Sequence, residues 1–371
     1  MSPETKRRRV LVTGGAGFIG SHVADAYLAR GDEVWIVDDL SSGKRENLPA
    51  DARFREMSVE DPELRDVFRE VGFDLVSHHA AQIDVRKSVA DPVFDARVNL
   101  IGLLNLAEAA VEVGTRRVIF VSSGGVVYGE ADDIPTPETA PKRPDSPYGV
   151  TKMTGEYYLR YYRRVHGLES VALRYSNVYG PRQDPHGEAG VVAIFSNRLE
   201  GGEPLTIFGD GEQTRDYVYV GDVVAANMRV SEMELPAGGD PARPEGGGGA
   251  GEREWEGGGG GEGESAETAG GGAGIDSFAF NVGTGKATSV NRLADHLETA
   301  AGLRPGREYR APRPGELRHS TLDIDKLRSH GWAPKTDLED GLRTTYRHIV
   351  GEKTTDPAEI RKAAVKQGGS E

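Results

Sequence analysis

One stretch, residues 10–20, restricts more than any other what this chain can fold into. An apolar run, Val10-Leu-Val-Thr, leads into a turn, Gly14-Gly-Ala-Gly-Phe-Ile-Gly20, and residues 21–30 after it have a helical pattern. Glycines at this spacing permit a tight turn, a close approach of the backbone to a pyrophosphate and close packing of a helix on a strand. The helix N-terminus then faces the anion. The stretch therefore predicts a strand–turn–helix unit that binds a dinucleotide.

Asp38 indicates which dinucleotide is bound. It ends the next apolar run, Glu33-Val-Trp-Ile-Val37, and lies 18 residues beyond Gly20. A carboxylate at this place accepts hydrogen bonds from the ribose hydroxyls and repels a 2′-phosphate. We therefore expect the cofactor to be NAD rather than NADP.

The alternation of strand-like and helical segments continues through the first half of the chain. Predicted helices at 61–71, 93–113 and 148–166 each precede a strand-like run, at 74–78, 117–121 and 169–173. Repeated units of this kind build a parallel sheet that helices cover on both faces. The predicted fold class is α/β, a Rossmann-type doubly wound parallel sheet. Functional groups are expected at the carboxyl ends of its strands, where the sequence places Ala80, Ala81, Ser122, Ser123 and Tyr175.

Beyond Pro181 the alternation loosens, which predicts a second, smaller domain. We expect an NAD-binding domain over 1–180 and a C-terminal substrate-binding domain over 181–350, followed by a polar tail over 351–371. The smaller domain is interrupted at 238–274, where 17 of 37 residues are glycine and 8 acids face 2 arginines. A segment with so little to bury is expected to be a disordered insert.

Composition excludes several classes of function. The formal net charge of −14 argues against a nucleic-acid partner. The sequence has no apolar run of about 18 residues or more, so no membrane span is expected, and the charged N-terminus does not resemble a signal peptide; we expect a cytoplasmic protein. Cysteine is absent and the nine histidines show no metal-ligand spacing, so no metal site is expected.

Tyr148 and Lys152 are candidates for acid–base chemistry. They lie four residues apart at the predicted start of a helix, so they share one helix face. A free tyrosine, with a pKa of about 10, is a poor base at neutral pH. A fixed cation beside it favours the phenolate and lowers that pKa. The pair can therefore move a proton on and off a sugar or alcohol hydroxyl, although such a pair, taken alone, is more often part of a helix surface.

Ordered motifs make the chain similar to the extended short-chain dehydrogenases/reductases, and most of all to the UDP-glucose 4-epimerases. The resemblance covers residues 8 to about 350, apart from the insert. The motifs that carry it are at residues 13–22, 38–43, 79–81, 99–102, 122–129, 147–152, 173–181, 209–217 and 313–316.

This resemblance implies an NAD-dependent isomerase that inverts C4 of a UDP-hexose, UDP-glucose or UDP-galactose, through a transient 4-keto sugar. Tyr148 would be the base, and Lys152 would hold the cofactor ribose. The implied cofactor-binding residues are Gly14, Gly17, Phe18, Ile19, Gly20, Asp38, Ala80, Ala81, Asn99, Ser122, Tyr148, Lys152 and Tyr175. The implied substrate-binding residues are Asn177, Arg215, Arg313 and Glu316. The family also implies a homodimer in which the helices near 93–113 and 148–166 form a four-helix bundle.

Two departures from the family pattern concern the sugar. Many members carry a serine or threonine four residues before the tyrosine of the Val-Tyr-Gly motif, where this chain has Gly124. Ser123 is our preferred substitute as hydrogen-bond partner of the sugar. Ser320 stands where glucose-specific members often have a bulky tyrosine, and a small residue there leaves room for a 2-acetamido group.

Five alternatives to a UDP-glucose 4-epimerase stay open. UDP-N-acetylglucosamine or UDP-glucuronate 4-epimerases would use the same machinery. Nucleotide-sugar dehydratases and decarboxylases need a carboxylate before the Val-Tyr-Gly motif, and Gly124-Gly-Val126 offers none. A non-catalytic NAD-sensing scaffold would not need Tyr148 and Lys152, and both are present.

Overall fold

The computed structural model describes residues 7–184, 190–235, 274–313 and 317–351. The predicted insert, apart from Gly274, lies outside these residues, as do Glu316 and the polar tail beyond Gly351. Within the described part of the chain, none of the helices is long and apolar enough to cross a membrane.

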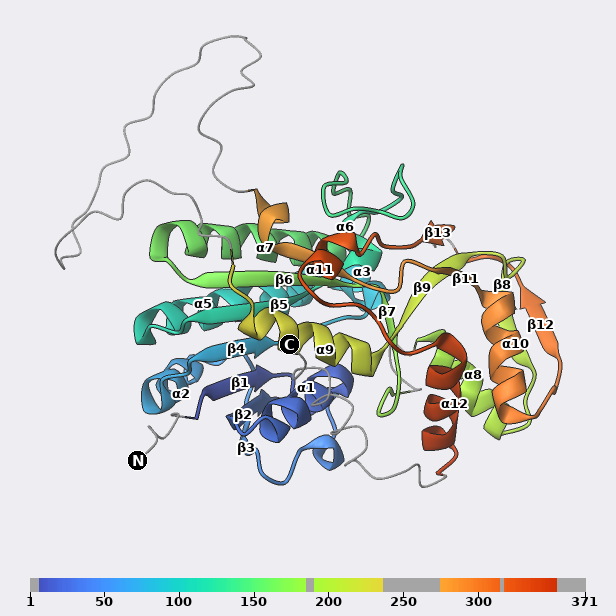
Figure 1. Cartoon of the computed structure of the whole chain (residues 1–371), viewed down its shortest axis with the longest axis horizontal. Coiled ribbons are helices and arrows are strands. Elements are labelled where there is room, and N and C mark those ends of the chain that lie inside the picture. The colour runs from blue at the N-terminus through green and yellow to red at the C-terminus, as the bar shows by residue number, and fades with distance from the viewer. Residues whose placement is uncertain (1–6, 185–189, 236–273, 314–316, 352–371) are drawn as a thin grey trace, which may run out of the picture.

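A seven-stranded parallel sheet forms the larger part of the molecule (Figure 1). Its strand order, β10-β6-β5-β4-β1-β2-β3, places β1 near the middle, with β2 and β4 on either side. The strands are β1 (Arg9–Thr13), β2 (Glu33–Asp38), β3 (Arg53–Glu56), β4 (Leu75–His78), β5 (Arg117–Ser123), β6 (Glu169–Tyr175) and β10 (Ala279–Val282). The order reverses at β1, and ligands bind at such a switch point. The predicted doubly wound fold is confirmed.

Helices cover both faces of this sheet because its strands alternate two apolar sets. Val10 and Val12 pack in a cluster with α1 (Phe18–Ala29) and α9 (Val220–Glu232). Leu11 points to the other face, in a cluster with α2 (Leu64–Val71), α5 (Gly102–Val113) and α7 (Pro147–His166). Shorter elements complete this part: η1 (Arg45–Asn47), α3 (Val85–Ala90), α4 (Pro92–Ala96), the π-helical turn η2 (Arg97–Ile101), α6 (Gly124–Val127), η3 (Ile275–Phe278) and α11 (Asp325–Ser329).

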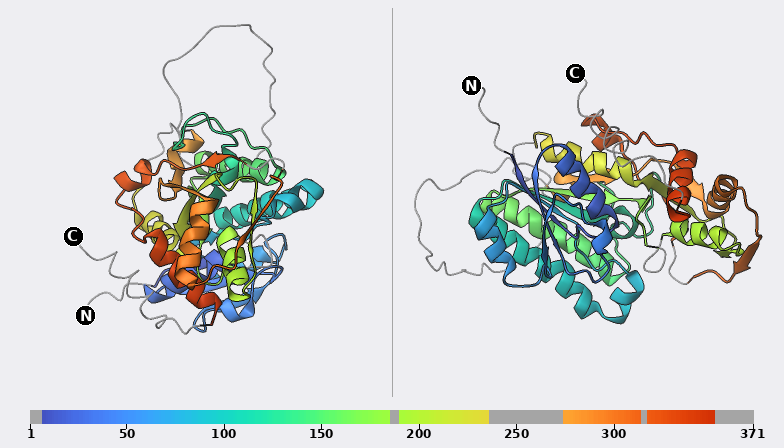
Figure 2. Two further views of the ribbon diagram at one scale, coloured as in Figure 1. Left: turned by 90° about the vertical axis from the view of Figure 1, so that its right-hand side faces the viewer. Right: turned by 90° about the horizontal axis from the view of Figure 1, so that it is seen from below.

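A smaller unit lies beyond the carboxyl ends of the large sheet, as the two views of Figure 2 also show. Strand β9 (Thr214–Tyr219) pairs with β7 (Asn177–Tyr179), β11 (Ala287–Ser289) and β13 (His319–Ser320). A second pair joins β8 (Leu205–Phe208) and β12 (Arg307–Arg310). Helices α8 (Val191–Glu200), α10 (Val290–Ala301) and α12 (Leu338–Ile349) share its apolar cluster.

The chain crosses between the two units more often than the sequence indicated. Strand β10 pairs with β6 as an edge strand of the large sheet, and α9 packs on α1. Both elements come from beyond residue 180, where the substrate-binding domain was expected to begin. The large unit therefore includes returning segments of the second half of the chain, because β6 would otherwise leave an unpaired edge.

Candidate active site

The glycine turn after β1 packs directly on the end of β4. Gly14 has φ +66°, and a Cβ atom there would lie 2.6 Å from the backbone nitrogen of Ala80. A Cβ atom on Gly20 would lie 2.2 Å from the carbonyl oxygen of Gly14. Any side chain at either position would force β1, α1 and β4 apart. The glycines therefore serve the tight turn and the close packing of helix on strand that the sequence predicted.

The N-terminus of α1 is left open for an anion. Gly17 is the N-cap residue and has no side chain to bond the first amides, and the first turn contains no acidic residue. The first helical amides, from Phe18 and Ile19, have no partner within a helix, and they carry the positive end of its dipole. These features fit the pyrophosphate of NAD.

Asp38 is positioned at the end of β2 by the same turn. Its carboxylate accepts hydrogen bonds from the amides of Ala16 (2.9 Å) and Leu40 (2.8 Å), and the residue is 7% exposed. Burial raises the pKa of this carboxyl, although the two amide bonds oppose that effect. Each oxygen keeps a lone pair beyond its amide contact, so the carboxylate fits the adenosine ribose hydroxyls of NAD.

Side-chain hydrogen bonds fix the end of β4 and the residues just after it. Thr13 Oγ1 accepts from the amide of Ala80 (3.2 Å) and bonds His78 Nδ1 (2.7 Å), while Ser77 Oγ bonds His79 Nε2 (2.8 Å). Burial, with the nearby Lys152 ammonium, lowers the pKa of both histidines to about 3. The histidines are therefore neutral and structural, and Thr13, which His78 bonds, fixes the backbone amide of Ala80.

The predicted base and its cation lie in the first turns of α7. Ser146 caps this helix by accepting from the amide of Gly149 (3.1 Å), and Pro147 is its first residue. A Cβ atom on Gly149 would lie 2.8 Å from the carbonyl oxygen of Val126, so α7 approaches α6 closely. Tyr148 is half-buried there.

Lys152 is held one turn further along α7. Its Nζ donates to the carbonyl oxygen of Val121 (2.9 Å), and lies 5.0 Å from the ring centre of Phe120 and 5.8 Å from that of Tyr148. Burial lowers the pKa of Lys152 from 10.5 to about 8, and the carboxylates of Asp95 and Glu156 oppose the shift. A cation at this place can stabilise a Tyr148 phenolate, which would make the phenol a usable base.

Asn99 belongs to a buried amide and carboxylate network. Its side chain bonds both backbone groups of Gln82 (2.9 and 3.0 Å) and also contacts Asp95 and Thr151. The network ties the loop after β4 to α4, η2 and α7. Asn99 therefore shapes the crevice through the Gln82 loop, and its predicted contact with the cofactor stays a prediction.

Ser122, Ser123 and Gly124, where β5 ends and α6 begins, have different surroundings. Ser122 is almost fully buried and its hydroxyl donates to Glu156 (2.6 Å), so the side chain binds α7. Ser123 is half-buried at the start of α6. A Cβ atom on Gly124 would lie 2.6 Å from Cδ1 of Leu322, which fills the space that a serine or threonine would need.

Tyr175 is placed differently from the other predicted cofactor residues. Its side chain is buried, and its hydroxyl accepts from Nδ2 of Asn227 on α9 (2.6 Å). Desolvation raises the pKa of this phenol. The side chain thus joins β6 to α9, and a role in cofactor binding would fall to the backbone of Tyr175.

The predicted substrate residues gather on the strands of the smaller unit. Asn177 is exposed on β7, and the register pairs it with Tyr217, two residues beyond Arg215 on β9. Arg215 pairs with Ser320 of β13 on one side and with Thr288 of β11 on the other. Paired residues share a face of the sheet, so Asn177, Arg215 and Ser320 line one side of it.

Arg313 lies on a separate segment. Its guanidinium carbon is 4.0 Å from the ring centre of Phe208, at the end of β8, so the side chain is held by a cation–π contact. Glu316, which is also predicted to bind the substrate, lies outside the described residues.

Comparison with known proteins identifies the family. Residues 10–240 match the model of the NAD dependent epimerase/dehydratase family, which is more than half of the chain. The chain belongs to this family. It is therefore an NAD-dependent epimerase, an isomerase of the extended short-chain dehydrogenase/reductase type, and NAD is its cofactor.

Individual members of the epimerase family are similar over nearly their whole length. A UDP-glucose 4-epimerase of Mycolicibacterium smegmatis is 43% identical, over 91% of this chain and 97% of the relative. The crystal structure of a Thermotoga maritima UDP-glucose 4-epimerase with UDP-glucose is 44% identical with a TM-score of 0.79, over 92% and 98% of the two chains. A UDP-N-acetylglucosamine 4-epimerase from Methanobrevibacter ruminantium, in complex with UDP-N-acetylmuramic acid, is 32% identical with a TM-score of 0.79, over 94% and 100%.

Sequence reasoning missed the buried groups that support the epimerase site. Thr13, Asp95 and Glu156 each bond a predicted site residue or its immediate neighbour. Glu156 could have been found, because it follows Lys152 by four residues on the same helix face. Asp95 carried the same kind of signal, because it precedes Asn99 by four residues, whereas its contacts with Gln82 and Thr151 could not be expected from spacing.

Proposed function

We propose that the protein interconverts UDP-glucose and UDP-galactose by inverting C4. The observation that supports this best is the placement of Tyr148 and Lys152 at the N-terminus of α7, with Lys152 Nζ fixed by the carbonyl oxygen of Val121. The high similarity to UDP-glucose 4-epimerases supports this sugar over others.

The chain's own residues would move the proton of the sugar C4 hydroxyl. NAD+ supplies, when bound, a reversible acceptor for the hydride on C4. Tyr148 takes the hydroxyl proton as phenolate and returns it after the 4-keto sugar has presented its other face. Lys152 stabilises the phenolate and holds the cofactor ribose. Ser123, half-buried at the end of β5, donates a hydrogen bond to the sugar in place of the residue that Gly124 lacks.

Cationic and amide groups of the smaller unit would hold the UDP diphosphate. Arg215 and Asn177 share one face of the β7–β9 sheet, and Arg313 is presented on the ring of Phe208. A guanidinium binds phosphate through two parallel hydrogen bonds, which suits a diphosphate clamp. Glu316 is proposed to contact the uridine ribose.

UDP-N-acetylglucosamine is the second candidate substrate because of Ser320. This residue pairs with Arg215, so a change in its size alters the space beside the proposed phosphate clamp. A serine leaves room for the 2-acetamido group. The relative that acts on UDP-N-acetylglucosamine shares the fold at 32% identity.

A substrate panel tests the proposal. Purified protein is incubated with UDP-glucose, UDP-N-acetylglucosamine, UDP-glucuronate and dTDP-glucose, and the products are separated by chromatography. We expect conversion of UDP-glucose to UDP-galactose, and Tyr148→Phe should abolish it while NAD stays bound. An unchanged pool of all four sugars would contradict the proposal, and a 4-keto-6-deoxy product would convert it to a dehydratase.

We further propose that the protein acts as a homodimer. Large apolar side chains are exposed on α4, η2 and α7, which pack together: Val93, Ile101, Val150, Tyr157, Tyr161 and Val165. We call this set the apolar face. A second copy of the chain presents the same face, so two copies can bury it in one symmetric contact.

A further inference from the structure

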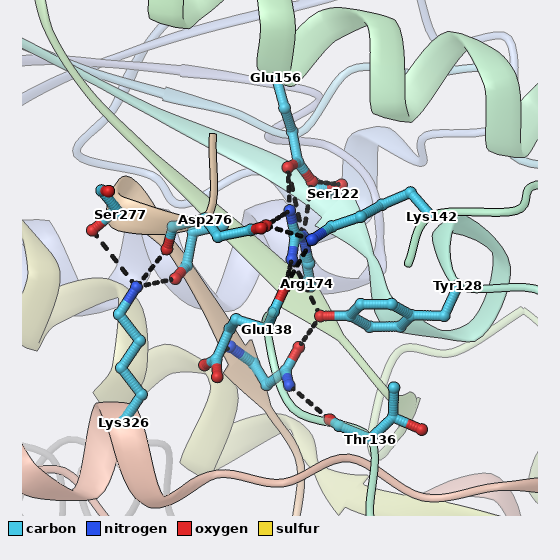
Figure 3. Close-up of polar contacts among 12 residues, drawn as sticks. Ser122, Tyr128, Thr136, Glu138, Lys142, Glu156, Arg174, Asp276, Ser277 and Lys326 are labelled. Atoms are coloured by element: carbon cyan, nitrogen blue, oxygen red, sulfur yellow. Dashed lines mark hydrogen bonds and ion pairs between the residues drawn. The ribbon is translucent and has the colours of Figure 1, made fainter. Parts of the chain in front are cut away.

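A buried ion pair lies directly behind the proposed base. Glu156 follows Lys152 by one turn of α7, and Arg174 of β6 reaches both oxygens of its carboxylate, with Nη2 at 2.5 Å and Nε at 3.0 and 3.2 Å (Figure 3). The side chain of Arg174 is 0% exposed and that of Glu156 is 2% exposed. Because several hydrogen bonds join the two groups, they fix the orientation of the Glu156 carboxylate relative to the Arg174 guanidinium as well as the distance between them.

The pair joins the elements that carry the site. Glu156 also accepts from the hydroxyl of Ser122 at the end of β5, and Arg174 donates to the phenol oxygen of Tyr128 (3.0 Å), just after α6. The carboxylate therefore holds α7 against β5, while the guanidinium connects β6 to the end of α6. Residues 148, 152 and 156 lie along one stripe of α7. The position of Glu156 consequently restricts the rotation of the helix that presents Tyr148 and Lys152.

A second pair of opposite charges, Asp276 and Lys142, extends the first, as Figure 3 shows. Asp276 of η3 accepts from Arg174 (2.9 Å) and pairs with Lys142 (2.5 Å). Taking such charges out of water costs several kcal/mol per ion, and well-packed apolar residues are often as stabilising. Stability alone is therefore a weak explanation for this group.

We propose that Glu156 and Arg174 are positioning residues for the reaction, which set the orientation of Tyr148 and Lys152 towards the crevice. This inference deepens the proposed function and rests on it. Neither residue contacts the reacting atoms: both act through α7.

Glu156 acts on Lys152 electrostatically as well. The groups that face Lys152 are Asp95 from α4, His78 at the end of β4 with His79 just after it, and Tyr148 and Glu156 from α7 itself. The two histidines are neutral, and the two carboxylates favour the charged ammonium. Removal of the Glu156 charge should therefore release the proton of Lys152 at a lower pH.

The same two strands provide a matched control at their opposite ends. Arg117 at the start of β5 bonds Glu169 at the start of β6, with Nε at 2.9 Å and Nη2 at 2.7 Å. Arg117 is also buried, and its remaining contacts go to the backbone of α9 and the residue after it. This pair supports the sheet, and the α7 residue whose charge it faces is Arg163 in the last turn of that helix, far from Tyr148 and Lys152 in the first turns.

The test compares Glu156→Gln with Glu169→Gln. For Glu156→Gln we expect kcat to fall by about 10- to 100-fold, as a small displacement of a reacting group does, with KM for the UDP-sugar within about twofold. The alkaline limb of its pH profile should move to lower pH. Glu169→Gln should keep the wild-type kcat and pH profile. Wild-type kcat and pH profile in Glu156→Gln, or an equal loss in both variants, would overturn the proposal.

Two further measurements keep the proposal testable. Arg174→Lys serves if Glu156→Gln does not fold, and NAD affinity serves if the wild-type protein turns over no sugar. Arg174→Lys keeps the Glu156 charge but loses the forked contact, so kcat should fall while the alkaline limb stays in place; an unchanged kcat contradicts the positioning role. NAD affinity across the alkaline range, read by fluorescence, should be lost at lower pH in Glu156→Gln than in wild type or Glu169→Gln. Identical curves of NAD affinity against pH in the three proteins contradict the positioning role, and this measurement needs no turnover. A wild-type protein that leaves every sugar unchanged contradicts only the proposed function.

Discussion

Lys152 carries its charge within a limited pH range. Burial lowers its pKa to about 8, against the opposing carboxylates of Asp95 and Glu156. The ammonium is therefore present below that pH and lost above it, together with its stabilisation of the Tyr148 phenolate. We expect turnover to decline as pH rises through about 8, whereas an unassisted tyrosine would gain activity towards its pKa of about 10.

The pH dependence of kcat checks this assignment. Lys152→Arg keeps a positive charge at all accessible pH values, because a guanidinium has a pKa above about 12. Its activity should be lower, since its shape differs, but the decline above pH 8 should disappear. A decline that persists unchanged in Lys152→Arg would show that another group titrates.

Gly124 and Leu322 form a coupled pair at the residue scale. A Cβ atom at position 124 would lie 2.6 Å from Cδ1 and 2.8 Å from Cδ2 of Leu322, which is almost fully buried. Gly124→Ser should therefore destabilise the protein by about 1–3 kcal/mol through overpacking. This contact explains physically why the chain lacks the serine or threonine that is common at this place in the family.

A double-mutant cycle measures the coupling. Leu322→Ala alone leaves a cavity and should cost about 2–5 kcal/mol. In the double variant the serine enters that cavity, so the loss in free energy of unfolding should be smaller than the sum by about 0.5–3 kcal/mol. Urea unfolding of the four proteins gives the four values, and strictly additive losses would refute the contact.

At the scale of elements, the start of α7 depends on its cap. Ser146 accepts from the amide of Gly149, and Tyr148 lies in this first turn. Ser146→Ala should cost about 1 kcal/mol of stability and should also lower kcat, because the turn that holds the base frays. Ser289 caps α10 of the smaller unit in the same way, accepting from the amide of Arg292 (3.2 Å).

Ser289→Ala is thus the matched control. Both variants should lose similar stability in denaturant unfolding, whereas only Ser146→Ala should lose turnover. Equal activity in the two variants would mean that Tyr148 is held by tertiary contacts alone.

Elements with strong local signals were predictable from the sequence. Helix α7 was expected over 148–166, and the structure places it at Pro147–His166. A proline at the first position and a glycine after the last turn mark α7 locally. Strand β3 has no local signal, because three of its four residues are exposed at the sheet edge and it lacks an apolar run.

Tertiary contacts decided what the sequence could not show. The helix expected over 93–113 is interrupted by the π-helical turn at Arg97–Ile101, which carries the Asn99 that bonds the Gln82 loop. The return of β10 to the large sheet depends on a partner more than 100 residues away in sequence. In the site, the glycine turn, Asp38, Tyr148 and Lys152 could be singled out from the sequence because each ends or follows a strand, or begins a helix, and their joint role stays a prediction.

For the whole molecule, the apolar face bears on the oligomeric state that we propose. Its side chains on α7 recur at Val150, Tyr157, Tyr161 and Val165, a helical stripe that neighbouring α4 and η2 extend with Val93 and Ile101. Exposed apolar side chains gathered on helices that pack together fit an interaction site. Two helices from each copy would bury it in one four-helix contact.

Charge on this face should separate the copies. We expect the wild-type protein to elute as a dimer in size-exclusion chromatography with light scattering, and Ile101→Asp combined with Tyr161→Asp to elute as a monomer, because two desolvated carboxylates per copy would oppose the contact. Leu303→Asp, on an exposed leucine just after α10, controls for added charge. A monomeric wild type, or a double variant that stays dimeric, would contradict the interface. Tyr148 and Lys152 lie on the same helix α7. The monomeric variant should therefore also lose turnover, because one face of that helix is no longer packed.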